Sequence, residues 1–143
     1  MDTTAGQHSV SVAGVIVDDQ RRALLIKRRD NQHWEPPGGI LERDEPIHDG
    51  VRREVREETG LSVAPISLSG VYKNMSRCII ALVFRCKILG GTLATNDEVS
   101  EFRWATAGEV SALVDEAFAI RVLDALEDQA APAIRQHDGV HLI

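Results

Sequence analysis

Apolar and polar positions alternate early in the chain and then give way to short apolar runs, a pattern typical of β-strands. Residues 8–17 (HSVSVAGVIV) predict a first strand and residues 21–29 (RRALLIKRR) a second, with a turn at Asp18-Asp19-Gln20 between them. Residues 30–39 (DNQHWEPPGG) contain two prolines and two glycines and have no periodicity, so we expect a loop there.

The clearest helix signal follows this loop. Asp44 and Glu45 precede a segment in which apolar residues recur at helical spacing, Pro46 stands in its first turn, and Gly60 follows its end. These local signals predict a helix from Pro46 to about Thr59.

The second half of the chain mixes strand and helix patterns. The expected elements are strands at 61–73, 76–89 and 101–106, a turn at Gly90-Gly91, and two helices within 108–129. Strands and helices in this order predict an α/β fold with a mixed sheet. Because no repeat or linker interrupts the 143 residues, we expect a single domain over 1–143. Its core would lie in about 8–127, and the pattern assigns no structure to a C-terminal tail at 128–143.

The charge balance narrows the classes of partner. The chain is 43% hydrophobic and 27% charged, as in ordinary globular proteins, and its formal net charge is −6 with a pI near 5.3. It lacks the basic character with which nucleic-acid-binding proteins hold phosphates, so we expect no nucleic-acid polymer as partner. A polyphosphate partner would need a cation between it and the protein.

The sequence points to neither a membrane nor an oxidising compartment. No apolar run approaches the ~18 residues of a membrane span, and the N-terminal segment lacks a signal-peptide pattern. If Cys78 and Cys86 lie in one strand, their Cα atoms are roughly 26 Å apart, too far for a disulfide. We therefore expect two reduced thiols in a core strand and a cytoplasmic protein. The five histidines have neither triad nor metal spacing, and we expect His137 and His141 to face solvent.

The predicted helix carries three glutamates on one face. A helix turns about 100° per residue, which puts Glu54, Glu57 and Glu58 within an arc of roughly 100°. The apolar stripe that should face the core overlaps this arc and consists of Ile47, Val51 and Val55. The opposite, solvent-facing side carries Asp49, Arg52 and Arg56. The three glutamates therefore lie at the edge of the buried face.

Two interpretations of this helix follow from the residues alone. A surface helix with salt bridges would carry such charge, as many helices rich in Glu and Arg do. Carboxylates crowded at a partly buried face repel one another, however, and Arg53 can offset the charge of Glu57 but not of all three. A divalent cation such as Mg²⁺ or Mn²⁺ would gather these oxygen ligands. Helix geometry leaves both interpretations open.

The surrounding motif favours the cation. Residues 39–61 match the pattern Gx5Ex7REUxEExGU, with U an apolar residue, at every specified position. These positions are Gly39, Glu45, Arg53, Glu54, Val55, Glu57, Glu58, Gly60 and Leu61. The pattern is the Nudix box, and the WEPPGG before it and the acidic segment before EFRW also resemble the Nudix hydrolase family. The resemblance spans roughly residues 8–127.

The resemblance implies an α/β/α sandwich in which the box forms a loop–helix–loop. It also implies a hydrolase that uses Mg²⁺ or Mn²⁺ to split a phosphoanhydride bond in a nucleoside diphosphate linked to another moiety. By position in the box, the metal ligands would be Glu54, Glu57 and Glu58, with a backbone carbonyl from Gly38 or Gly39, of which Gly38 is favoured. The box residues expected to take part in catalysis are Glu57, Glu58, Arg53 and Glu45, the last two as braces for the ligands.

Further candidates lie outside the box. Family members take a base or a further metal ligand from a loop before a late strand, which here is TNDEVSEFRW. Glu98 and Glu101 are both candidate bases, and Glu98, in the looser loop, is also a candidate metal ligand. Arg28 and Arg29 end the second strand and are candidate substrate ligands, although charge at a strand end also serves solubility. Trp34 either stacks on a base or packs the loop onto the core.

The resemblance leaves the substrate open. Residues 75–79 read MSRCI and lack the proline and tyrosine signatures of the ADP-ribose and diadenosine polyphosphate subfamilies. By elimination, the favoured activity is that of a (deoxy)nucleoside triphosphate pyrophosphohydrolase. The alternatives are a sugar-nucleotide or dinucleotide pyrophosphatase, a non-catalytic Nudix-fold nucleotide-binding module, and a Nudix-fold isoprenoid diphosphate isomerase. We expect a small nucleotide as partner and no membrane, and a homodimer would be common for the family.

Overall fold

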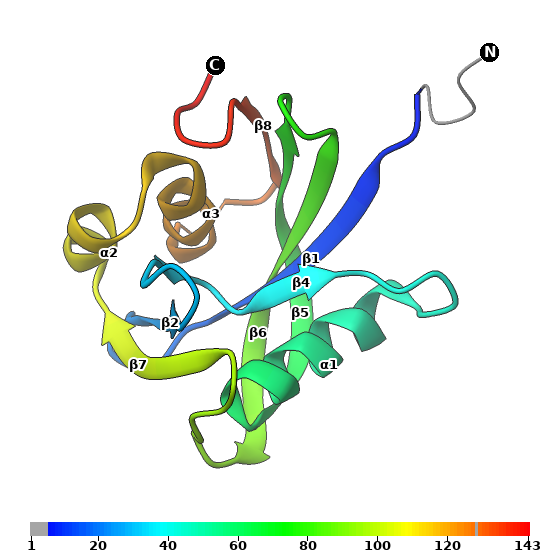
Figure 1. Ribbon diagram of the computed structural model, residues 1–143. Coiled ribbons are helices and arrows are strands. Elements are labelled where there is room, and N and C mark those ends of the chain that lie inside the picture. The colour runs from blue at the N-terminus through cyan, green and yellow to red at the C-terminus, as the bar shows by residue number, and fades with distance from the viewer. Residues whose placement is uncertain (1–5, 128) are drawn as a thin grey trace.

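Two small sheets and three helices make up the part of the chain that the computed structural model describes, residues 6–127 and 129–143 (Figure 1). The elements in chain order are β1 (Ser9–Ile16), β2 (Ala23–Arg28), β3 (Trp34–Glu35), β4 (Gly38–Ile40), α1 (Ile47–Thr59), β5 (Leu61–Asn74), β6 (Ile79–Gly91), β7 (Val99–Ala105), α2 (Ala107–Leu113), α3 (Glu116–Leu126) and β8 (Ala133–His137). No helix in these two ranges is long and apolar enough to cross a membrane.

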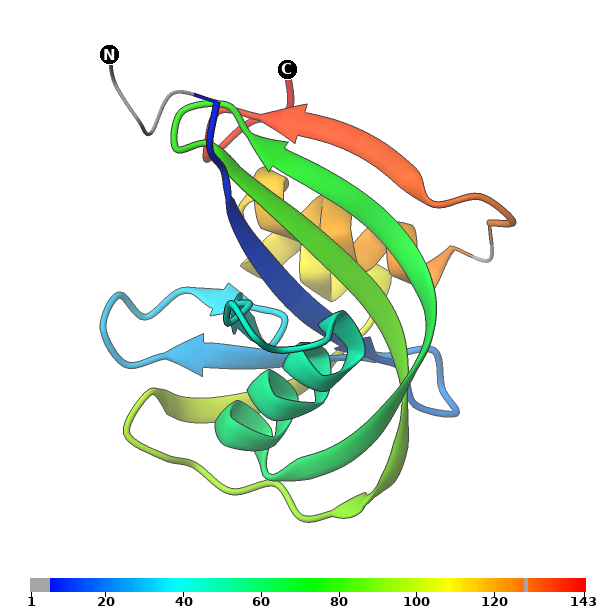
Figure 2. The same ribbon diagram turned by 90° about the vertical axis from the view of Figure 1, so that its right-hand side faces the viewer.

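The larger sheet is mixed, as the order of strands and helices predicts. Its strand order is β4-β1-β6-β5-β8, with β1 parallel to β6 and β5 parallel to β8, whereas the β1–β4 and β5–β6 pairs are antiparallel. The smaller sheet, β3-β2-β7, is antiparallel. In Figure 2 the long strands β5 and β6 curve past α1, with α2 and α3 behind them.

Alternate residues of the central strands supply two separate cores, because successive side chains of a strand point to opposite faces. On β1, Val12 and Ile16 pack with Val51 and Val55 of α1. Val15, between them, belongs to the cluster formed with α2 and α3. Helices therefore cover both faces of the sheet, and the α/β/α sandwich implied by the box resemblance is confirmed.

Helix α1 begins and ends where local sequence signals predict. Pro46 is its N-cap, and Gly60 is its C-cap with a φ of 84°, in the left-handed region that favours glycine. A Cβ on Gly60 would also collide with the carbonyl oxygen of Thr92. The prediction for Ile47 is wrong: this residue is 43% exposed, because the core on this face includes Val51 and Val55 but not the first turn of the helix.

The C-terminal tail is part of the sheet, contrary to the expectation that it has no assigned structure. Residues 133–137 form β8 and pair in parallel with Gly70–Asn74 of β5. This pairing leaves His137 fully buried, so the prediction that it faces solvent is wrong. His141, four residues further on, is exposed as expected.

Three further boundaries differ from the sequence prediction. Cys78 does not lie in a core strand but in the exposed turn before β6, with a φ of 53°, whereas Cys86 is a buried strand residue as expected. No turn forms at Gly90-Gly91, because β6 continues through both glycines and Gly91 pairs with Leu61. The expected loop at 30–39 contains β3 and the start of β4. Strand β3 pairs with β2 across a short turn, and β4 pairs with β1, which is distant in sequence.

Candidate active site

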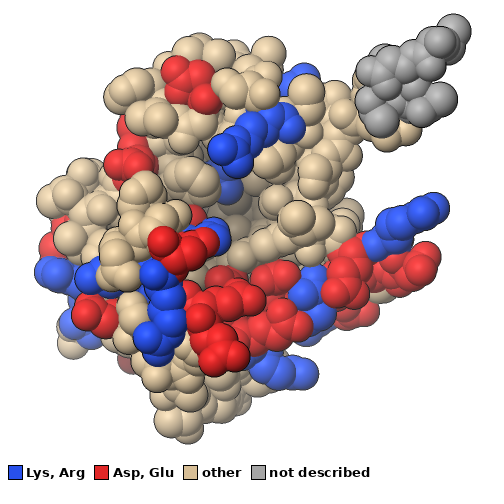
Figure 3. Space-filling view, viewed as in Figure 1, with Lys and Arg blue, Asp and Glu red and all other residues tan. Residues whose placement is uncertain are grey.

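A cleft of about 590 Å³ lies between the box helix α1, strand β4 and the loop before β7. Seven carboxylates and three guanidinium groups line it, which gives a formal charge of −4. The acidic residues are Asp30, Glu42, Glu54, Glu57, Glu58, Asp97 and Glu98, and the basic ones are Arg28, Arg29 and Arg53. The acidic side chains form a dense band below a hollow in the surface in Figure 3.

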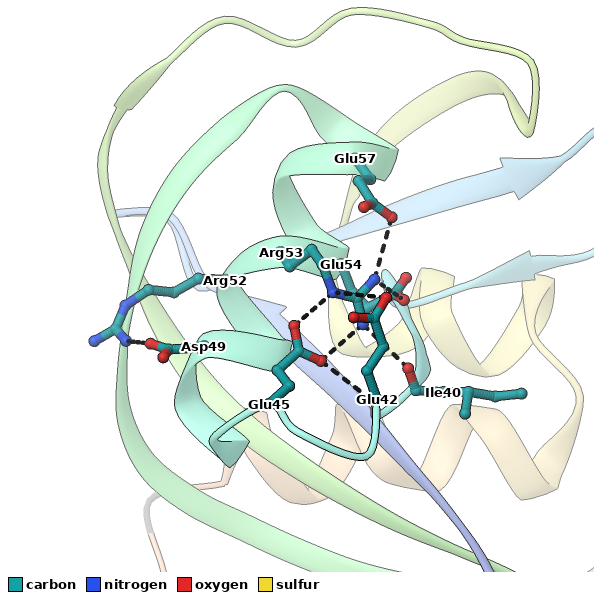
Figure 4. A network of polar contacts seen from close by, with 8 residues as sticks. All are labelled: Ile40, Glu42, Glu45, Asp49, Arg52, Arg53, Glu54 and Glu57. Atoms are coloured by element: carbon teal, nitrogen blue, oxygen red, sulfur yellow. Dashed lines mark hydrogen bonds and ion pairs between the residues drawn. The ribbon is translucent and has the colours of Figure 1, made fainter.

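Arg53 is the centre of the polar network in this cleft (Figure 4). Its Nε and Nη2 donate to the two carboxylate oxygens of Glu45 at 2.6 and 2.9 Å. Its Nη1 donates to Glu54 at 2.8 Å and to Glu57 at 3.3 Å, and Nη2 also donates to the carbonyl oxygen of Ile40 at 3.1 Å. One guanidinium thus fixes three of the box carboxylates and joins α1 to β4.

The box glutamates differ in burial. The side chain of Glu54 is 12% exposed, and burial raises its pKa against the lowering effect of Arg53. The side chain of Glu57 is 59% exposed and faces the mouth of the cleft. Glu58 is buried, and one of its oxygens accepts a hydrogen bond from the amide of Gly38 at 2.7 Å.

Glu58 has the most perturbed carboxyl group of the cleft. Burial raises its pKa to about 8, the charges of Glu54, Glu35 and Glu98 add to the rise, and the Gly38 amide opposes it. A carboxyl that is buried among other carboxylates is ionised at neutral pH only if positive charge joins it. Such perturbed groups in a cleft are typical of functional sites.

The two glycines of β4 let the backbone approach these glutamates closely. A Cβ on Gly39 would lie 2.6 Å from the Glu54 carboxylate, and a Cβ on Gly38 would lie 2.8 Å from the Cα of Ala13 on the neighbouring strand. Gly38 is therefore required by the neighbouring backbone, whereas a side chain at position 39 would displace the Glu54 carboxylate.

The donor set of the cleft fits a hard divalent cation. Carboxylate and carbonyl oxygens are the ligands that Mg²⁺ and Mn²⁺ prefer, and the excess of negative charge at Glu54, Glu57, Glu58 and Glu98 calls for a cation. In the described part of the chain, no three acidic, His or Cys side chains already stand at the spacing of metal ligands. Instead, Nη1 of Arg53 bridges Glu54 and Glu57. The residues fit the ion, and Glu54 and Glu57 would have to turn from Arg53 to hold it.

Asn96 holds the loop that brings Glu98 to the cleft, and sequence analysis missed it. Its side-chain amide donates to the carbonyl oxygens of Glu57 and Glu58 at 3.2 and 3.0 Å. Its Oδ1 accepts from the amides of Glu98 and Val99 at 2.9 and 3.0 Å. Asn96 thereby ties the C-terminal end of α1 to the acidic loop. The sequence does contain a local signal for this turn, because asparagine side chains commonly accept from the backbone amide two residues later, and Glu98 is two residues after Asn96.

The structure separates the candidates outside the box. Glu98 lines the cleft, whereas Glu101 is exposed on β7, paired with Lys27 of β2, and is not among the lining residues. Arg29 lines the cleft, and its Nε donates to the carbonyl oxygen of Asn96 at 2.7 Å. Arg28 lines it as well, but pairs with Asp30 and Glu35.

Trp34 lies outside the carboxylate cleft. It lines a separate cavity of about 210 Å³ that shares Arg28 with the cleft, and it packs against the core cluster formed with α2 and α3. Of the two expectations for this residue, the packing of the loop onto the core is the one that its contacts support.

Comparison with known proteins gives the same family as the box. The sequence profile of the NUDIX domain matches residues 7–126. A MutT-like protein of Streptomyces ambofaciens is 55% identical over 141 residues, which is 99% of this chain and 91% of that protein. An ADP-ribose pyrophosphatase of Methanocaldococcus jannaschii is 38% identical over 100 residues, which is 65% of this chain and 59% of that protein.

A solved structure shows the same fold. The crystal structure of an ADP-ribose pyrophosphatase from Streptococcus suis superposes with a TM-score of 0.77 at 21% identity, covering 92% of this chain and all of that one. The profile match over most of the chain, the close relative and the complete box in its loop–helix–loop show that this protein belongs to the Nudix family and is a Nudix hydrolase.

Proposed function

We propose that the protein hydrolyses a phosphoanhydride bond in a nucleoside diphosphate linked to another moiety, with Mg²⁺ or Mn²⁺ as cofactor. The observation that carries this proposal is the cleft lined by Glu54, Glu57, Glu58 and Glu98. The complete lining of this cleft has a formal charge of −4. A pyrophosphate can approach such a surface only when cations neutralise both.

The residues that would hold the cation are Glu54, Glu57, Glu58 and Glu98, with a backbone carbonyl of Gly38. When bound, the cation neutralises the pyrophosphate and stabilises charge on its leaving oxygen. Glu45 and Arg53 brace the glutamates, and Arg29, which also lines the cleft, would contact the phosphates.

Proton transfer is assigned to Glu98. It stands on a loop at the open side of the cleft, where it would take the proton of the attacking water. Glu101 would need the start of β7 to separate from β2 before it reached the same place, because it is paired with Lys27.

A (deoxy)nucleoside triphosphate is the first candidate substrate, since the chain lacks the signatures that mark the ADP-ribose and diadenosine subfamilies. A nucleoside diphosphate sugar is the second candidate. It is favoured by the name of the Methanocaldococcus jannaschii relative, an ADP-ribose pyrophosphatase. A hydrolysis screen over triphosphates, sugar nucleotides and dinucleoside polyphosphates, with Mg²⁺ and with Mn²⁺, distinguishes these classes.

The catalytic assignment is tested by Glu57→Gln and Glu58→Gln, measured on the best substrate of that screen. Each variant should lose at least ~100-fold in kcat, because a metal ligand loses its charge while the side-chain volume stays the same. Asp49→Asn on the solvent face of the same helix is the matched control and should keep the activity. Near-normal turnover of either glutamine variant would refute the metal assignment, and a silent screen would favour a binding module.

A further inference from the structure

A second cavity of about 560 Å³ opens beside the carboxylate cleft, in the hollow above the acidic band in Figure 3. Both are lined by Arg28, Gly38, Gly39 and Ile40, so they meet at β4. Gly38, whose amide donates to Glu58, is thus part of both walls. A molecule whose pyrophosphate lies in the cleft would place its remaining groups in this cavity.

Arg121 of α3 lines this cavity and is 92% buried, with an exposed fraction of 8%. Its guanidinium lies among aromatic rings: the Cζ atom is 4.6 Å from the ring centre of Phe118 and 5.5 Å from that of Tyr72. Burial lowers the pKa of Arg121 to about 10, so the group is still charged at neutral pH. The rings hold the guanidinium in place and bring no counter-charge.

Hydrogen-bond acceptors for this guanidinium are lacking in the described chain. Its Nε has none. One of its terminal nitrogens, Nη2, lies 3.3 Å from Nε2 of His137. The amide of Gly139 donates to Nδ1 of the same ring at 3.0 Å, so a neutral His137 carries its proton on Nε2 and offers Arg121 no lone pair there. Burial and the charge of Arg121 both lower the pKa of His137, which keeps the ring neutral.

The carboxylates around Arg121 are committed to other partners. Asp124, one turn along α3, accepts from Arg135 at 2.7 and 2.8 Å and from the hydroxyl of Tyr72 at 2.7 Å. Glu35 accepts from Arg28 at 3.2 Å and forms no ion pair with Arg121, although its charge offsets part of the effect of burial on the pKa of Arg121. A buried cation without a counter-ion is costly, and pairing with an anion removes much of that cost.

Arg77 adds a second guanidinium at the rim. It lies in the exposed turn before β6, lines the same cavity, and forms no ion pair with any residue of the described ranges. The cavity lining contains three arginines and two carboxylates, a formal charge of +1 next to a cleft of −4. Ile79, Phe118 and Val140 supply apolar wall between these charges.

We propose that this cavity binds an oxyanion, a phosphate or a carboxylate, on the moiety linked to the scissile pyrophosphate, and that Arg121 is the residue that selects it. The proposal rests on the proposed function for the position of the pyrophosphate. It narrows the substrate to nucleotides whose linked group carries a further anion, such as the terminal phosphate of a triphosphate or the carboxylate of a sugar acid. Arginine suits this task because its planar fork meets both oxygens of such a group.

The test is binding by calorimetry with Ca²⁺ in place of Mg²⁺, because Ca²⁺ neutralises the cleft but prefers a larger and looser ligand shell, so that hydrolysis is slow during the measurement. Two ligand pairs each differ by one anionic group: ADP with ATP, and UDP-glucose with UDP-glucuronate. We expect the more anionic member of at least one pair to bind about tenfold tighter, the effect of one charge-assisted hydrogen-bond pair, and the pair that responds identifies the anion. In Arg121→Met the preference should fall below about twofold. In Arg103→Met, an arginine outside the cavity, it should persist.

Thermal unfolding shows whether Arg121 selects the anion or only stabilises the fold. Replacing an uncompensated buried charge by an apolar side chain should leave the Tm of Arg121→Met unchanged or higher, whereas loss of a structural contact would lower it.

If that variant does not fold, Arg77→Met on the exposed turn carries the test and should reduce the preference about threefold. The proposal is overturned if neither pair shows a preference, if the preference survives in Arg121→Met, or if only Arg29→Met in the cleft abolishes it. Because binding is measured and not turnover, a protein that hydrolyses none of these ligands would still answer the question.

Discussion

Arg53 explains why the box needs an arginine at this position and not merely a positive charge. Its hydrogen bonds to both oxygens of Glu45 are the largest cause of the lowered pKa of that carboxyl group, which stays ionised as a brace. The third nitrogen, Nη1, still reaches Glu54 and Glu57. A lysine would supply one point charge and could not hold three carboxylates in a fixed arrangement.

Gly39 has no side chain, and this leaves space for the Glu54 carboxylate. In Gly39→Ala the new Cβ would lie 2.6 Å from that carboxylate, so Glu54 must move. Displacement of a proposed metal ligand by about 1 Å is expected to cost about 100-fold in rate. We therefore expect kcat to fall by about that factor while circular dichroism shows an intact fold.

Gly90→Ala is the matched control for this substitution. Gly90 lies on β6, and a Cβ there would meet no atom within 4 Å. Its activity should equal that of the unsubstituted protein. An active Gly39→Ala variant would mean that activity does not need the Glu54 carboxylate beside Gly39.

The ends and the buried face of helix α1 could be predicted from the sequence, because both are encoded locally. Pro46 and Gly60 mark the ends of α1, and the helical period places Val51 and Val55 in the core, because capping and periodicity depend on neighbours in the chain. The box likewise identifies the glutamates by spacing alone. Local sequence could show Asn96 only as a turn residue before Glu98, because its contact with α1 depends on a carbonyl group 38 residues earlier.

Strand β8 was not predictable for the same reason. Its five residues pair in parallel with Gly70–Asn74 of β5, more than sixty positions away, and the segment has no strong apolar alternation of its own. The burial of His137 follows from that pairing and from the packing of Phe118 and Arg121 of α3 against it. Local sequence therefore could not show that the tail closes the second cavity with Asp138, Gly139 and Val140.

The buried His137 predicts how stability depends on pH at this element. Burial, and then the charge of Arg121, lower its pKa below the usual 6.5, while Asp138 opposes them. The unfolded chain therefore binds the proton more readily, so the stabilisation by the neutral ring is complete above pH 6.5 and is lost as pH falls below it. The expected slope is at most roughly 1.4 kcal/mol per pH unit. Tm measured from pH 7.5 to 5 should show this fall.

The contribution of this one histidine is isolated by His137→Asn. The amide oxygen of asparagine can still accept from the amide of Gly139, but it does not titrate. The Tm of the variant should depend less on pH over the same range, whereas His33→Asn in an exposed loop should behave like the unsubstituted protein. Equal pH slopes for all three proteins would contradict the assignment.

The whole molecule places two hollows of opposite charge on either side of one short strand, β4. The sheet core brings α1 with its glutamates to one hollow, and α3 with Arg121, together with the turn after β8, to the other. Gly38 and Gly39 form the thin wall between them. A net charge of −6 for the chain hides this separation, because the formal charge of +1 around the cavity is outweighed by the −4 around the cleft.

The acidic cleft predicts that divalent cations stabilise the whole fold. A ligand that binds only the folded state adds about 2.7 kcal/mol at 100 times its Kd, and for a chain of this size each kcal/mol raises Tm by roughly 2–4 °C. Saturating Mg²⁺ should therefore raise Tm by several degrees, whereas NaCl at equal ionic strength should not, and EDTA should reverse the shift.

Because the pKa of Glu58 is raised to about 8, protons compete with the cation, so the shift should be larger at pH 8.5 than at pH 6.5. Glu58→Gln should lose most of the shift and Asp49→Asn should keep it; an equal shift in both variants would place the cation elsewhere on the acidic surface.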